Sequence, residues 1–109
     1  MDSEKLPSAL QAENVRKKVV IYGMTIIGKA LINRLKGEYE IPYCLDRKME
    51  GMEYIGIPLH GTADFTGLDK DVTVIIALNW SEHIIERMLR GAGYDSIIYI
   101  RNLTGVEVE

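Results

Sequence analysis

Residues 18–28 read KVVIYGMTIIG, and this stretch decides the fold that we expect of the chain. Its first half is an unbroken apolar run, Val19–Tyr22, that ends at Gly23. A short β-branched run without alternation is typical of a strand buried on both faces of a parallel sheet. Beyond the turn, apolar residues recur at helical spacing as far as Leu35. The stretch therefore predicts a buried strand, a tight glycine turn and an amphipathic helix.

The rest of the chain continues this alternation of strands and helices. Further strands are expected over residues 39–45, 57–59, 72–78 and 96–100. Helices are expected over 62–68, capped by Thr62, and from Ser81 as N-cap to Gly91, with Ile84, Ile85 and Leu89 in the buried stripe. Strands that alternate with helices favour parallel pairing through right-handed crossovers. We predict an α/β fold, a small three-layer domain with a mostly parallel sheet, with the first strand central and helices on both faces.

The glycine turn carries the chemical signal. A dinucleotide-binding fingerprint reads G-x-G-x-x-G between a strand and a helix, with an acid about 20 residues further on. Gly23 and Gly28 occupy the first and last glycine positions, and Asp46 closes the next expected strand. Thr25 replaces the middle glycine, where its methyl group takes space that a pyrophosphate would use. Its hydroxyl can bond a phosphate oxygen or cap the helix. The pattern predicts a Rossmann-like domain.

The candidate ligand contacts follow from this placement. Free backbone N–H groups and the positive dipole end at a helix start attract phosphate, and a carboxylate accepts hydrogen bonds from ribose or base. Asn79 and Trp80 follow the third strong strand, where α/β sheets bind ligands, although Asn79 can also simply turn the chain. The expected nucleotide-binding residues are Gly23, Met24, Thr25, Ile26, Ile27, Gly28, Asp46, Arg47 and Asn79. The opposing interpretation is that the glycines serve only packing and Asp46 ends a strand in solvent.

Composition argues against several functional classes. A net charge of -3 leaves no basic footprint for nucleic acid. Cys44 is the single cysteine, so we expect no internal disulfide, and no Cys/His spacing suits a metal. No apolar run approaches the ~20 residues that span a bilayer. No serine or cysteine has a partner base at a recognisable spacing, so we predict no catalytic residue. We expect a cytoplasmic protein without membrane insertion.

Three motifs together resemble a known family. They are VVIYG…G at 19–28, LDR at 45–47 and GIPLHG at 56–61. They are similar to the Rossmann-like N-terminal domain of PglD-type sugar O-acyltransferases and of nucleotide-sugar dehydratases and epimerases in polysaccharide biosynthesis, over residues 18–100. The resemblance implies a nucleotide sugar, with its phosphates near Gly23, Thr25 and Gly28 and its base or ribose near Asp46. Arg47 replaces the second acid of the family's pair, which alters the expected base specificity.

The predicted organisation has three parts. Residues 1–16 form a leader, 17–101 the Rossmann-like nucleotide-binding domain, and 102–109 a tail or a linker to a further domain. The first functional hypothesis is binding of a nucleotide sugar, NAD or NADP, as part of a cell-surface polysaccharide biosynthesis enzyme whose chemistry resides in a following domain. The alternative is a non-catalytic module for self-association, as a homodimer, or for regulation, without a physiological nucleotide.

Overall fold

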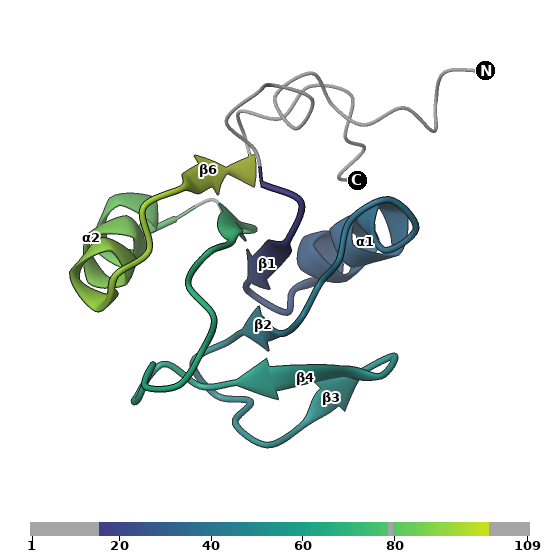
Figure 1. The fold of residues 1–109 in the computed structure, drawn as a ribbon, viewed down its shortest axis with the longest axis horizontal. Coiled ribbons are helices and arrows are strands. Elements are labelled where there is room, and N and C mark those ends of the chain that lie inside the picture. The colour runs from purple at the N-terminus through teal and green to yellow at the C-terminus, as the bar shows by residue number, and fades with distance from the viewer. Residues whose placement is uncertain (1–15, 79, 101–109) are drawn as a thin grey trace.

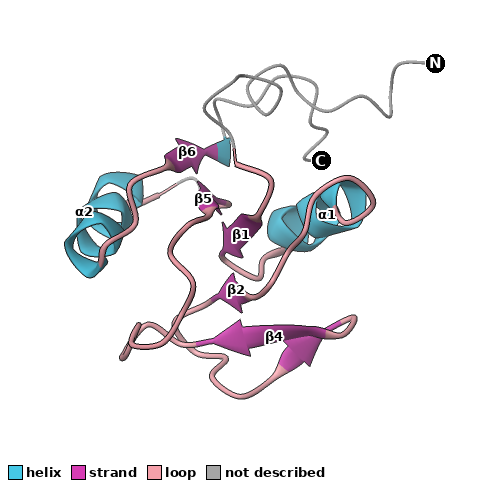
Figure 2. Cartoon of the chain, in the orientation of Figure 1, coloured by secondary structure: helices cyan, strands magenta, loops and turns pink. Residues whose placement is uncertain are grey.

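The computed structural model, which describes residues 16–78 and 80–100, contains one six-stranded sheet and two helices (Figures 1 and 2). Its elements are β1 (Val19–Tyr22), α1 (Ile26–Leu35), β2 (Cys44–Leu45), β3 (Glu53–Tyr54), β4 (Ile57–His60), β5 (Thr73–Ile76), α2 (Glu82–Ala92) and β6 (Ile97–Tyr99). The strand order is β3-β4-β2-β1-β5-β6, and every neighbouring pair is parallel except the β3–β4 hairpin. The predicted α/β fold with a mostly parallel sheet is confirmed.

β1 occupies the centre of the sheet, as predicted. It pairs with β5 along its whole length, from Val19 opposite Thr73 to Tyr22 opposite Ile76, and with β2 on its other side. All four of its residues are buried. An unbroken apolar run suits this position because both faces of the strand are covered and both of its edges are paired.

Each face of the sheet has its own apolar core and its own helix. Ile21 belongs to the core that contains Leu31 of α1. The neighbouring Val20 points to the opposite face, into the core that contains Leu89 of α2. Figure 1 shows the two helices on opposite sides of the sheet. Helices therefore cover both faces, as the alternation of elements predicts.

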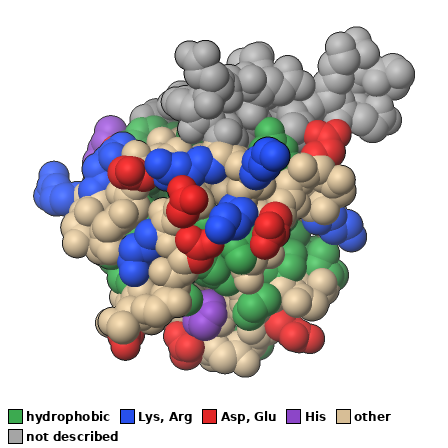
Figure 3. Space-filling view, viewed as in Figure 1, with side chains coloured by type: hydrophobic (Ala, Val, Ile, Leu, Met, Phe, Trp, Pro, Cys, Tyr) green, Lys and Arg blue, Asp and Glu red, His purple; other side chains and the backbone are tan. Residues whose placement is uncertain are grey.

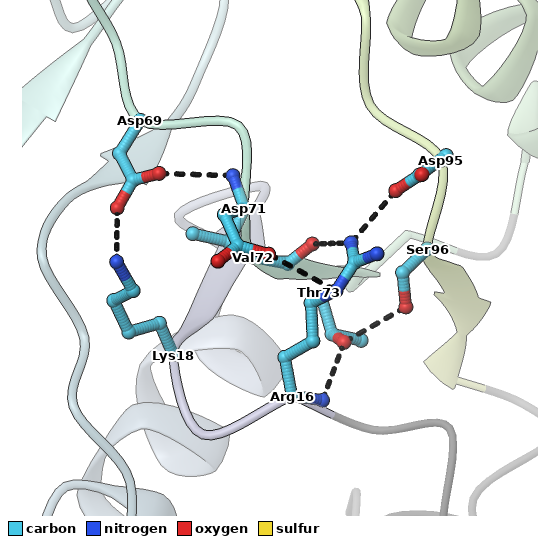
Figure 4. Close-up of polar contacts among 8 residues, drawn as sticks. All are labelled: Arg16, Lys18, Asp69, Asp71, Val72, Thr73, Asp95 and Ser96. Atoms are coloured by element: carbon cyan, nitrogen blue, oxygen red, sulfur yellow. Dashed lines mark hydrogen bonds and ion pairs between the residues drawn. The ribbon is translucent and has the colours of Figure 1, made fainter.

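The surface shown in Figure 3 mixes acidic and basic side chains, without a large area of one sign. At the amino end of the sheet, where β1 and β5 begin, these charges form a connected network (Figure 4). Arg16 donates to Asp95 at 2.7 Å and to the Val72 carbonyl at 3.2 Å, and its own amide donates to the buried Thr73 hydroxyl at 3.0 Å. The Thr73 hydroxyl also lies 2.8 Å from that of Ser96. The network ties the segment before β1 to β5 and β6.

Two predictions for the middle of the chain are wrong. The strand over 39–45 is reduced to β2, with one isolated bridge between Lys18 and Glu40, because Pro42 has no N–H to continue the ladder. The helix over 62–68 does not form. There, the Asp64 carboxylate accepts the Thr66 amide at 2.9 Å, a side-chain turn that competes with helix.

The β3–β4 hairpin was not predicted, since only its second strand was expected. Its turn holds Ile55 and Gly56 at φ 44° and 85°, and such a pair of positive φ values is typical of a type I′ turn. Isoleucine is rare in that conformation, so the usual Asn-Gly signal is missing.

No helix of the described residues is long and apolar enough to cross a membrane. The predicted leader, apart from Arg16, and the predicted tail lie outside the described residues.

Candidate functional site

A cleft of about 610 Å³ opens at the carboxyl end of the sheet. The glycine turn after β1 and the residues that follow β2 line one part of it, and the start of α2 lines another. From β1, the chain passes through α1 to β2, which lies on one side of β1. It later returns to β5 on the other side of β1, and α2 then leads from β5 to β6. In open α/β sheets, ligands bind at the carboxyl ends of the strands where the chain reverses its direction across the sheet.

The two glycines of the turn have structural reasons that need no ligand. Gly23 adopts φ +106°, a conformation that L side chains rarely take. A Cβ added to Gly28 would lie 2.0 Å from the carbonyl oxygen of Gly23. The first turn of α1 therefore rests directly on the backbone of the glycine turn, and this close approach brings the helix start to the cleft.

Thr25, in the position of the missing middle glycine, caps α1. Its hydroxyl accepts the Gly28 amide at 3.0 Å and donates to the Ala77 carbonyl at 3.2 Å. Its backbone is extended, as is usual for an N-cap residue. The sequence leaves two roles open for this hydroxyl, phosphate binding and helix capping, and in the structure it caps the helix. The same side chain also ties the glycine turn to the end of β5.

Asp46 lies beside the glycine turn and fastens it. One carboxylate oxygen accepts the Met24 amide at 2.8 Å, and the other accepts the Lys48 amide at 3.1 Å. The side chain therefore does more than end a strand in solvent. Each carboxylate oxygen can accept more than one hydrogen bond, so a ligand hydroxyl can still donate to it. The glycine turn and Asp46, which are far apart in the sequence, are thus in direct contact in the structure.

The remaining residues of the turn divide between core and surface. The side chains of Met24 and Ile27 pack in the core under α1, whereas Ile26 is 85% exposed. The amides of Ile26 and Ile27 belong to the first turn of α1 and so have no acceptor within the helix. Unlike the Met24 amide, which Asp46 accepts, these two amides can donate to an anion.

The part of the cleft near β2 is cationic, and the part near α2 is apolar. The exposed Arg47 and Lys48 line the first part. Trp80 and Ile84 line the second and are 64% and 66% exposed. Ile84 does not belong to the buried stripe of α2, so that prediction is wrong, whereas Ile85 and Leu89 are buried as predicted.

The start of α2 differs from the predicted cap. Ser81 is at the N-cap position, but its φ of 59° is left-handed and its side chain makes no capping hydrogen bond. Asn79, the last of the expected contacts, lies outside the described residues. Lys48 and Met88 line the cleft without having been predicted, and their separation along the chain leaves no local signal that they meet.

Burial raises the pKa of two titratable groups in the central strands. Burial, with the nearby Asp46 carboxylate, raises the pKa of the Tyr22 hydroxyl, which lines the cleft and stays protonated at neutral pH. Burial also raises the pKa of the Cys44 thiol to about 11. Among the described residues, no three His, Cys, Asp or Glu side chains gather to hold a metal ion.

Comparison with known proteins found no match to a family model, to a curated protein or to a solved structure. The functional conclusion therefore depends on the geometry of the cleft.

Proposed function

We propose that this chain is a Rossmann-like domain that binds a nucleotide or nucleotide sugar in the cleft at the carboxyl end of its sheet. The parallel strands β1, β2, β4, β5 and β6 lie in the order third, second, first, fourth, fifth. That order is shared by the first five strands of doubly wound dinucleotide-binding folds, in which the ligand lies at the point of reversal. The cleft occupies this point, which supports the proposal.

The observation that carries the proposal is that the charged residues after β2 share one cleft with Thr25, the N-cap residue of α1. The amides of Ile26 and Ile27 suit a phosphate, because they combine unused donors with the positive end of the helix dipole. Arg47 and Lys48 add positive charge, which phosphates favour. Asp46 is held by two backbone amides in a position where it can accept hydrogen bonds from ribose hydroxyls or a base N–H.

The proposed ligand also bears on the biological setting of the protein. We propose that the described residues bind the ligand, and we assign no reaction to them. In keeping with the family resemblance, we place the domain in a cytoplasmic enzyme of cell-surface polysaccharide biosynthesis, with the chemistry in a following domain. NAD and NADP are the other ligands to consider, and the cations beside Asp46 suit a 2′-phosphate.

A second function has its own support, namely a module for self-association or regulation without a nucleotide. Trp80 and Ile84 leave large apolar side chains exposed at one place, and such patches mark interfaces. The engagement of Thr25 and Asp46 within the protein also explains their presence without a ligand. Under this alternative, a homodimer covers the cleft.

Calorimetric titration of the full chain with UDP-glucose, NAD and NADP separates the two functions. We expect at least one of them to bind and, at a hundred times its Kd, to stabilise the fold by about 2.7 kcal/mol. Asp46→Asn keeps an oxygen for the Met24 amide but loses the charge, and it should weaken binding by about 1.5–3 kcal/mol.

Asp64→Asn is the matched control, because Asp64 also accepts a backbone amide two residues on but lies outside the cleft. It should leave affinity unchanged. Absence of binding to all three nucleotides, together with a concentration-dependent dimer in sedimentation that Trp80→Ala abolishes, would favour the self-association module instead.

A further inference from the structure

Three large apolar side chains are exposed at the carboxyl end of the sheet. Ile26 begins α1, Trp80 precedes α2, and Ile84 lies in the first turn of α2. Their exposed fractions are 85%, 64% and 66%. Within the described part of the chain, the other large apolar side chains exposed to this degree are Met52 and Ile55, in the segment of the β3–β4 hairpin. Exposed apolar groups that gather at one end of a domain mark a surface for interaction.

The same end of the molecule carries exposed cations. Arg47 and Lys48 line the cleft, and Arg87 lies one helical turn beyond Ile84 on α2. All three side chains are exposed, and none of them forms an ion pair with another described residue. The surface therefore combines apolar side chains with fixed positive charge.

The acidic side chains of this end are engaged within the protein. The carboxylates of Asp46 and Glu50 accept backbone amides. Glu86 accepts a hydrogen bond from Arg90 at 2.7 Å, and Glu82 is only 6% exposed. The charge that this surface leaves for a partner is therefore mainly positive, and an anionic partner complements it.

A second copy of the chain meets this surface at a disadvantage. In a two-fold symmetric dimer the same surface faces itself, so Arg47 and Lys48 of one copy approach those of the other. Like charges brought together in this way oppose association. Because the nearby acids are already engaged, they do not relieve the repulsion.

The surface of a membrane that contains anionic lipids meets both requirements. Indole rings concentrate at the boundary between headgroups and acyl chains, where the ring is buried and its N–H stays hydrated. Exposed cations are attracted to anionic headgroups. Apolar side chains that stand on the two sides of a cleft can each enter a fluid headgroup region, which needs no matching protein surface.

We propose that the carboxyl end of the sheet rests on an anionic membrane surface, with its three exposed apolar side chains among the headgroups and its three cations against the lipid phosphates. The contact is peripheral and reversible, and it requires no helix that spans the bilayer. This inference goes beyond the proposed function. Arg47 and Lys48 are also the cations that we assign to a nucleotide, so the test contains no nucleotide.

Trp80 is the only tryptophan of the chain, so its fluorescence reports directly on this contact. The full chain is mixed with vesicles of phosphatidylcholine alone, or of equal parts phosphatidylcholine and phosphatidylglycerol. We expect a blue shift of the emission and cosedimentation with the anionic vesicles. Each cation near an anionic surface contributes about fivefold to the affinity, so three cations should favour the anionic vesicles about a hundredfold. Added salt should weaken the binding.

Two variants test the apolar part of the contact, with affinities measured by cosedimentation. Trp80→Ala should weaken vesicle binding about tenfold, and Ile84→Ala about fivefold, because each removes apolar area that the headgroup region covers. Ile55→Ala is the matched control. Ile55 is 51% exposed, but it lies in the turn before β4, at the opposite end of that parallel strand. Its removal should leave vesicle binding unchanged.

A second pair of variants tests the charge. Arg87→Gln should weaken binding to the anionic vesicles about fivefold. Arg87 does not line the cleft, so this loss reports on the surface and not on the cleft interior. Lys36→Gln also removes an exposed cation, but Lys36 follows α1 at the other end of that helix, and the variant should bind as the wild type does.

The outcomes decide between the partners. The inference is overturned if the vesicles do not bind, if neutral and anionic vesicles bind equally, or if each control variant loses as much affinity as its counterpart. A concentration-dependent dimer without vesicle binding assigns the surface to a second copy, and tighter binding of a single-stranded oligonucleotide assigns it to nucleic acid. Calorimetry with nucleotides is a separate measurement, so the proposed function and this inference can fail independently.

Discussion

The two ends of the sheet use their charged side chains differently. At the amino end, the charges serve one another: Arg16 bonds Asp95, and Lys18 pairs with Asp69 at 2.5 Å (Figure 4). Within the described part of the chain, neither Arg47 nor Lys48 at the carboxyl end forms an ion pair. The amino end therefore uses its charges to hold the fold, whereas Arg47 and Lys48 at the carboxyl end take no part in such pairs.

Some contacts at the carboxyl end are nevertheless structural, and Gly28 gives the largest expected effect. Gly28→Ala places a Cβ against the Gly23 carbonyl, so either the helix or the turn must move. We expect a loss of about 3 kcal/mol in unfolding free energy, at the top of the range for overpacking, measured by urea denaturation. Gly91→Ala is the control: Gly91 is helical, with nothing within 4 Å of its added Cβ, and should gain about 0.5–1 kcal/mol. Equal stability of the two variants would remove the close approach from our description of the turn.

Asp46 gives the next effect and combines both uses of this end. Asp46→Ala leaves the partly buried Met24 amide without its acceptor, so we expect a loss of about 1–2 kcal/mol in unfolding free energy even without ligand. Asp46→Asn should recover most of that loss in the same denaturation experiment. A loss below about 0.5 kcal/mol for alanine would show that Asp46 does not fasten the turn, and the carboxylate would then serve ligand alone.

The amino end is tested by pH. Arg16 bonds the Asp95 carboxylate and holds its pKa below the ordinary value of about 4. Because the folded pKa is lowered, this stabilisation is complete above about pH 4 and is lost as the pH falls through the folded pKa. Arg16→Met should therefore be less stable than the wild type by a constant amount from pH 7 to 5, smaller than for Asp46→Ala, and the difference should narrow below pH 4 in urea titrations.

Arg87→Met is the control for this pH series, because Arg87 is exposed on α2 and takes no part in the network at the amino end. Its stability should follow that of the wild type at every pH. A difference between Arg16→Met and wild type that persists unchanged to pH 2 would mean that the guanidinium acts through packing and the Val72 carbonyl, not through Asp95.

Trp80 gives the smallest expected effect on stability. Trp80→Ala removes a side chain that is 64% exposed, so the unfolding free energy should change by no more than about 0.5 kcal/mol. Thermal and urea denaturation of the variant measure it. A loss of several kcal/mol would show that the indole supports the fold, and the contrast between the two ends of the sheet would then weaken.

The sequence predicts those parts of the fold whose signal is local. β1 and β5 are unbroken apolar runs, and the glycine turn requires two glycines at a fixed spacing. The β3–β4 hairpin was missed because Ile55 carries none of the usual turn chemistry. Helical periodicity placed Ile84 in the core because spacing alone does not distinguish a residue that faces the sheet from one that lines a cleft beside it.

Part of the candidate site can also be predicted from the sequence, and part of it depends on the tertiary structure. The contact between Asp46 and the glycine turn follows from the fingerprint, which encodes two neighbouring parallel strands. Thr25 caps α1 through the nearby Gly28 amide, but its second hydrogen bond goes to the carbonyl of Ala77, which follows β5 and is distant in the sequence. Lys48 and Met88 reach the cleft from elements that are far apart in the chain, so only the tertiary structure brings them together.

The central position of β1 has a consequence for how the protein folds. Its longest partner is β5, and the bond from Thr25 to Ala77 joins residues 52 apart in the sequence. The chain must lose the entropy of closing that loop before the pairing can stabilise anything. During synthesis, the first strand and helix therefore leave the ribosome before the residues of β5 that complete their core. We expect the amino-terminal half to stay without a stable fold until β5 emerges, after which the sheet assembles from its centre outward.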